Sequence, residues 1–169
     1  MYSLTKHLGY TVWATTKLSQ ILEKADESLL KKETPSSFNT IEKTILHIWD
    51  ADLVWLKRLQ GESLLEWPSK DFKGDKGALL AGWLQNTIDL NNHVASKTPE
   101  YLQSQINYKN MAGKPYSNTI EEIIYHVVNH GTFHRGQIVT MMRKHGWTEL
   151  PINEELTSTD LITYLRETK

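Results

Sequence analysis

Three of the seven histidines in this chain lie within nine residues, at His126, His130 and His134. If this segment is helical, neighbouring members of the trio are one turn apart, which lets two imidazoles converge on one metal ion. The outer two are about 12 Å apart along the axis, so all three cannot easily reach the same ion. Burial favours the pair His130 and His134, because His134 falls near the middle of the apolar face and His126 at its edge.

Metal binding is one of three explanations that the pattern leaves open for His130 and His134. Structural histidines bonded within the core are the second, and another polar role is the third. Each desolvated ring needs a partner, which makes two buried histidines one turn apart harder to explain as purely structural. Gly131 and Gly136 each cost about 1 kcal/mol relative to alanine within a helix, and they leave room for a ligand or for a closely packed neighbouring helix.

Two histidines on one helix do not complete a metal site, and periodicity does not identify a third ligand. The candidates are a carboxylate or one of four other histidines: His7, His47, His93 and His145. His47 falls on the polar flank of its expected helix, and by pattern alone it is a surface residue. Asp52 lies among the apolar positions of the same helix, where a carboxylate needs a partner. Its alternatives are to orient a histidine ligand or to form a salt bridge.

Long proline-free stretches supply the elements that would position these residues. The hydrophobic spacing predicts four long helices, over residues 3–26, 40–60, 76–97 and 119–145, and a short closing helix over 159–167. Residues 99–118 form either a loop or a short hairpin, and we expect a loop. Four long helices with almost no strand pattern predict an all-α four-helix bundle, in a single domain over residues 1–169.

Two of the expected helices open alike, with the sequence Asn-Thr-Ile-Glu at residues 39–42 and 118–121. Each segment places an asparagine three residues before a glutamate, which predicts Asn39 and Asn118 as N-caps in a capping-box arrangement. The likeness continues through NTIEKTILHI and NTIEEIIYHV and places His47 opposite His126. A remnant of duplication would explain this similarity, but we favour the alternative that two unrelated helices use the same type of N-terminal cap.

Composition excludes several classes of protein. The 169 residues contain 19 Lys and Arg against 20 Asp and Glu, and this formal net charge of -1 argues against binding nucleic acid through bulk phosphate attraction. The absence of cysteine excludes disulfides, thiolate zinc sites, iron–sulfur clusters and a cysteine nucleophile. With no signal-peptide core and no apolar run of about 18 residues, we expect a cytoplasmic protein without a membrane span.

The segment HVVNHGTFHRGQI at residues 126–138 resembles the signature of the DinB/YfiT-like superfamily of metalloenzymes. Residues 10–14 (YTVWA), 44–61 (TILHIWDADLVWLKRLQG) and 158–167 (STDLITYLRE) resemble that family's first, second and closing helices. The resemblance implies a four-helix bundle of up-down-down-up connectivity, often dimeric, that binds one divalent metal ion. In that family three histidines bind the ion, and their positions match His47, His130 and His134 here.

Three neutral imidazoles that leave coordination positions open are typical of a catalytic site rather than a sealed structural one. The resemblance implies metal-dependent hydrolysis or transfer of a low-molecular-weight thiol. Imidazole ligands suit zinc, nickel, copper and iron alike, and zinc or nickel is the metal that we expect. A chain without cysteine would borrow that thiol from a co-substrate. Our leading interpretation is therefore a metal-dependent enzyme that acts on a small electrophilic molecule as a homodimer. The alternatives are a non-catalytic stress-response bundle that binds a metal or small ligand, and a purely structural dimer module.

No residue identifies the substrate. Arg135 has two interpretations, an exposed helix arginine or a group that holds an anion, and we expect it to face solvent. The tryptophans also have two interpretations, because Trp13, Trp49 and Trp55 either pack in the core or form the wall of a pocket. We expect them to belong to the core.

Overall fold

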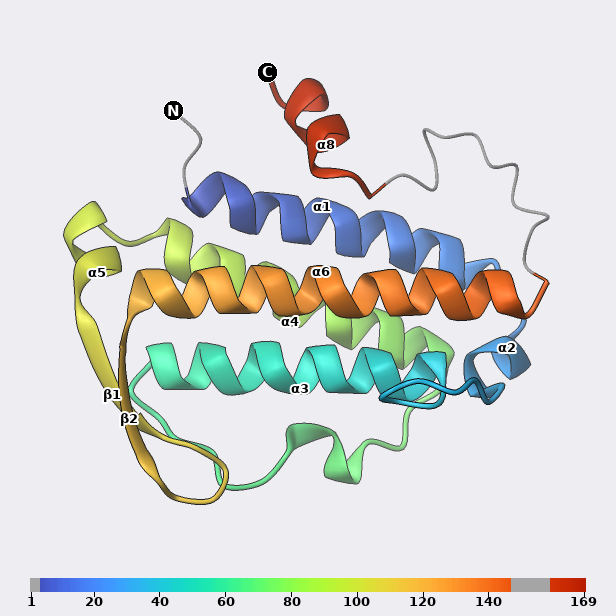
Figure 1. Ribbon diagram of the computed structural model, residues 1–169, viewed down its shortest axis with the longest axis horizontal. Helices are drawn as coiled ribbons and strands as arrows, with labels where there is room; N and C mark the ends of the chain where they lie inside the picture. Colours follow the sequence, from blue (N-terminus) through green and yellow to red (C-terminus); the bar gives the residue numbers. More distant parts are fainter. Residues whose placement is uncertain (1–3, 147–158) are drawn as a thin grey trace.

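Four long helices form the body of the computed structural model, which describes residues 4–146 and 159–169. They are α1 (Leu4–Glu23), α3 (Ile41–Leu59), α4 (Lys76–Ala95) and α6 (Ile120–Lys144). Figure 1 shows α1 and α6 running in one direction and α3 and α4 in the opposite one, which is up-down-down-up connectivity. The predicted all-α four-helix bundle is confirmed. None of the described helices is long and apolar enough to cross a membrane.

Short elements fill the connections between the long helices. Helix α2 (Glu27–Lys31) follows α1, and the short helix η1 (Pro68–Asp71) lies between α3 and α4. Helix α5 (Pro99–Gln103) leads into the antiparallel strands β1 (Gln105–Lys109) and β2 (Pro115–Thr119). Helix α8 (Leu161–Glu167) lies against α1 and is the predicted closing helix.

The hairpin β1–β2 shows that our expectation of a loop over residues 99–118 was wrong. Its turn is built by Asn110, whose side-chain oxygen accepts two backbone N–H groups of the turn at 3.0 and 2.9 Å. Gly113 has a φ of 78°, a backbone conformation that favours glycine. Ile106 and Tyr108 alternate with polar neighbours and were the available signal, but strands of five residues carry little periodicity.

The helix caps fall one residue after the predicted positions. The hydroxyl of Thr40 caps α3, and Thr119 caps α6 in a complete capping box with Glu122. Asn39 and Asn118 are therefore not the N-caps, although the amide of Asn118 donates to the Glu122 carboxylate at 3.1 Å. The threonines fit the cap position because their hydroxyls accept from the exposed N–H groups of the first turn.

Two apolar clusters fill the bundle, one toward each end of the long helices. The first surrounds the fully buried Trp83. Trp49 packs against this first cluster, and Trp13 and Trp55 pack against the second. All three are partly buried, which supports the core interpretation of these side chains.

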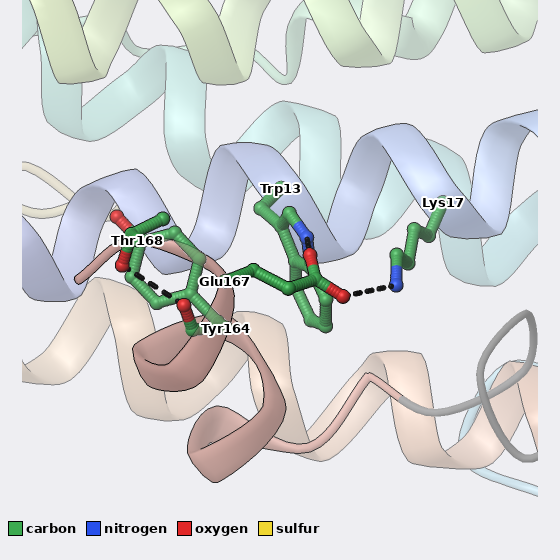
Figure 2. Close-up of polar contacts among 5 residues, drawn as sticks. All are labelled: Trp13, Lys17, Tyr164, Glu167 and Thr168. Atoms are coloured by element: carbon green, nitrogen blue, oxygen red, sulfur yellow. Dashed lines mark hydrogen bonds and ion pairs between the residues drawn. The ribbon is translucent and has the colours of Figure 1, made fainter.

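Helix α8 is held on α1 by contacts from both helices. The Glu167 carboxylate accepts from Trp13 Nε1 at 2.7 Å and pairs with Lys17 Nζ at 3.3 Å (Figure 2). Tyr164 packs against Trp13, with 5.7 Å between ring centroids. A Cβ at Gly9 would lie 2.5 Å from the Tyr164 hydroxyl oxygen. The closing helix therefore docks in this position because residue 9 has no side chain.

We expect Gly9→Ala to lower the free energy of unfolding, although alanine is the better helix former by about 1 kcal/mol. The added methyl group forces the buried Tyr164 to move, and overpacking of this kind costs about 1–3 kcal/mol. Urea unfolding followed by circular dichroism measures the change. The control is Gly9→Ala with Tyr164→Phe, which removes the clashing hydroxyl and should return most of the stability. An equal loss in both variants would contradict this explanation.

Candidate metal centre

His47, His130 and His134 come together where α3 packs against α6. Their ligand nitrogens lie within 4.8 Å of one another, and the Nε2 atoms of His47 and His130 are 2.9 Å apart. Two nitrogens bound to the same ion at the usual zinc–nitrogen distance are about 3 Å apart. The structure therefore groups all three predicted ligands at a spacing that suits one ion.

The other histidines of the described chain lie outside this group. His126 is exposed, one turn before His130, with its ring centroid 5.8 Å from that of His130 and 5.5 Å from that of Trp55. His93 bonds to a tyrosine of α5 at 3.2 Å, and His145 bonds to a threonine of the loop before α3 at 2.7 Å. Geometry thus selects His47 from the candidates for a third ligand.

His47 is half-buried rather than a surface residue. Phe38, from the loop before α3, stacks on its ring at a centroid distance of 4.0 Å and also contacts His134 edge-on at 5.7 Å. The helical pattern indicated a polar flank because it contained no information about this loop. Phe38 therefore belongs to the site, and sequence reasoning missed it.

Burial keeps the imidazoles of His47 and His130 neutral. It lowers the pKa of His47 to about 4, with a smaller contribution from the charge of His134. Burial, with smaller contributions from the charges of three neighbouring histidines, lowers the pKa of His130 to about 3. A divalent cation binds the lone pair of a neutral imidazole, so this environment suits metal binding at neutral pH.

The contact between His47 and His130 provides a direct test of whether an ion fits. Without an ion, one Nε2 must donate its proton to the other across 2.9 Å. A bound ion would use the lone pairs of both imidazoles, as neutral imidazole ligands require. The residues present therefore fit a divalent transition metal, and His47, His130 and His134 would hold it.

Gln137 orients His134. Its Oε1 lies 2.7 Å from Nδ1 of His134, and an amide oxygen only accepts, so Nδ1 carries the proton. The lone pair is then on Nε2 and free to bind an ion, which is how hydrogen-bonded neighbours usually orient metal-binding histidines. Sequence reasoning missed this role, although Gln137 lies within the segment 126–138 and three residues after the histidine.

We expect Gln137→Leu to weaken zinc affinity about 10–100-fold, because residues that orient metal ligands contribute effects of that size. The loss frees the His134 ring to rotate and removes the preference for the tautomer that binds metal. Competition titration against a chromogenic zinc chelator measures the affinity. Gln85→Leu, at an exposed position of α4, is the matched control and should bind zinc as the wild type does. Equal affinities for both variants would rule out an orienting role.

Arg135 is buried, with 2% of its surface exposed, so our expectation that it faces solvent was wrong. Its side chain folds back along α6, where Nη2 donates to Thr132 Oγ1 at 3.0 Å. A Cβ at Gly131 would lie 2.9 Å from Arg135 Nη1. Gly131 therefore makes room for an arginine of its own helix rather than for a metal ligand.

Asp52 is also buried, and its neighbours are Arg135 and Thr87 rather than a histidine of the metal group. Burial raises the pKa of its carboxyl to about 7, while the charge of Arg135 and a hydrogen bond from Thr87 act in the opposite direction. Among the described residues Asp52 neither contacts a histidine of the metal group nor forms a salt bridge, so neither alternative for this carboxylate is confirmed, and Arg135 acts on it through its charge alone. The carboxylate belongs to the polar interior of the bundle.

Comparison with known proteins identifies similar proteins over most of the chain. The model of the DinB family matches residues 1–162. The chain is 29% identical over 166 residues to Protein DinB of Bacillus subtilis (strain 168), covering 95% of this chain and 92% of that protein. A crystal structure of a DinB-like protein from Bacillus cereus ATCC 10987 has a TM-score of 0.62 at 19% identity, over 82% of this chain and 87% of the other, which shows a shared fold. The chain belongs to the DinB family.

Proposed function

We propose that this protein is a metal-dependent enzyme that acts on a small molecule through one divalent ion bound by His47, His130 and His134. The convergence of three imidazoles from two helices, with burial lowering the pKa of His47 and His130, carries the proposal. Zinc and nickel are the expected metals, because both accept imidazole ligands. A bound ion would supply Lewis acidity toward a carbonyl oxygen or a thiolate.

The protein's own residues would hold the reacting group in a partly dry site. Three protein ligands leave coordination positions for a substrate, which is typical of catalytic rather than structural metal sites. Phe38 covers His47 and keeps water from that side of the ring, while Gln137 fixes His134. We propose two reaction classes for this arrangement: hydrolysis, or transfer of a low-molecular-weight thiol that acts as co-substrate.

A second candidate is a non-catalytic bundle that binds a metal or a small ligand. One observation favours it: in the described part of the chain, the metal group contains histidines and no carboxylate that could act as a general base. The same observation favours thiol transfer over hydrolysis, because a thiolate attacks without a general base. The homodimer implied by the family resemblance stays a prediction.

The enzyme proposal is tested by measuring whether turnover increases with the fraction of the protein that contains bound metal. Metal-free, zinc-loaded and nickel-loaded protein would be assayed against p-nitrophenyl esters and, with added cysteine or glutathione, against 1-chloro-2,4-dinitrobenzene. We expect turnover in proportion to bound metal and none after chelation. His126→Ala, which changes a histidine outside the metal group, should keep the activity. Stoichiometric metal without turnover across the panel would favour the second candidate.

A further inference from the structure

A groove of about 390 Å³ lies beside the candidate metal centre, between the loop before α3 and the C-terminal half of α6. Two of its lining residues also touch a proposed metal ligand. Gln137 forms part of its wall and binds His134 Nδ1 at 2.7 Å. The ring centroid of Phe133, another wall residue, is 5.1 Å from that of His134. The groove and the metal centre therefore share a boundary.

The walls of this groove are partly polar, partly apolar and uncharged. None of the described residues that line it carries a charged side chain. Thr34, Ser36 and Thr140 contribute hydroxyl groups, and Phe133 contributes an apolar ring that is 61% exposed. An ionic ligand would lose hydration here without gaining an opposite charge, whereas an uncharged molecule with an apolar part finds suitable contacts for both of its parts.

Gly136 leaves part of the groove open. A Cβ at this position would meet no atom within 4 Å, unlike a Cβ at Gly131, which would press on Arg135. Glycine within a helix costs about 1 kcal/mol relative to alanine, and close packing does not account for it at residue 136. A ligand lying along α6 at this point would use the space.

We propose that this groove binds the small-molecule substrate, and that the bound part of the substrate is uncharged and partly apolar. The inference rests on the proposed function, since it assigns a substrate class to the same site. Gln137 supplies the polar contact: its oxygen is used by His134, and its amide nitrogen has no hydrogen-bond partner among the described residues. A substrate that accepts from this nitrogen lies next to a metal ligand.

Three fragments with the same ring and different charge test the groove: benzyl alcohol, benzoate and benzylamine. Backbone amide shifts of the metal-free full-length chain would be followed by NMR, and the titrations repeated with zinc. In the metal-free chain we expect benzyl alcohol to shift the amides of Gly136, Gln137 and Thr140. The charged fragments should bind at least about tenfold more weakly, because the groove offers them no counter-charge. Equal binding of all three, or no shifts at these residues, would overturn the inference.

Matched leucine variants locate the binding. Gly136→Leu fills the open space and should weaken benzyl alcohol binding by about tenfold or more. Asn129→Leu places the same side chain on an exposed position of α6 outside the groove and should leave binding unchanged. Unaltered binding in Gly136→Leu would contradict the proposal, and circular dichroism checks that both variants fold. These titrations need neither metal nor turnover. The groove proposal can therefore be contradicted while metal binding is confirmed, or confirmed while metal binding is contradicted.

Discussion

Replacing His130 and His134 together with alanine is expected to abolish stoichiometric metal binding. Plasma mass spectrometry on tag-free wild-type protein should find about one ion per chain, as a three-histidine site predicts. The double variant keeps only one of the three imidazoles, and a single imidazole does not hold a divalent ion against solvent and chelators. The identity of the bound metal would then select the substrates to be screened.

Two single variants make this experiment specific. His47→Ala removes the ligand from α3 and should also lose the ion, because the group needs both helices. His126→Ala removes an exposed imidazole of the same helix and should retain it. Absence of stoichiometric metal in the wild type, even after incubation with zinc or nickel, would leave a bundle of DinB ancestry without an active centre, and the enzyme proposal would be abandoned.

The periodicity of apolar residues was sufficient to predict the long helices and one pair of candidate metal ligands. The four long proline-free stretches form α1, α3, α4 and α6, and they could be predicted because the apolar stripe that each helix packs into the core recurs along its own sequence. His130 and His134 could be paired because the four-residue spacing places both on one face. The apolar stripes and the histidine spacing both depend only on residues that are close together in the sequence, so the sequence alone predicts them.

The features that were missed depend on contacts between distant segments. His47 looked like a surface residue because the pattern of α3 contains nothing about Phe38, which covers it from a loop. Arg135 looked exposed because its burial depends on a fold-back into the space left by Gly131. The family resemblance placed His47 in the site where periodicity alone placed it on the surface.

The charge of Arg135 acts on the buried carboxyl of Asp52, and this leads to a second large effect, on stability. Arg135→Met should cost about 2 kcal/mol more of the free energy of unfolding at about pH 8.5 than at about pH 5.5, because the buried Asp52 carboxylate loses the attraction of the arginine charge. Burial already raises the pKa of Asp52 to about 7, against 3.8 for a free side chain. Removal of the arginine charge raises this pKa further.

The sign of the pH dependence follows from that pKa. Between the unfolded value of 3.8 and the folded value of about 7, the folded chain keeps a proton that the unfolded chain has released. The contribution of Asp52 to stability is therefore complete below the unfolded pKa and is lost as the pH rises through the folded pKa. Below about pH 6 the carboxyl is protonated in both folded proteins, so the charge-dependent cost of Arg135→Met should appear only as the pH rises above about 7.

Urea unfolding of metal-free protein at about pH 5.5 and about pH 8.5 measures this difference, and subtracting the wild type at each pH cancels the other titrating groups. The remaining cost at the lower pH comes from lost packing against Tyr10 and the lost hydrogen bond to Thr132. Asp52→Asn removes the titrating carboxyl, so the cost of Arg135→Met measured against the Asp52→Asn single variant should be the same at both pH values. A cost of Arg135→Met that does not change with pH would mean that the arginine stabilises the bundle through packing alone.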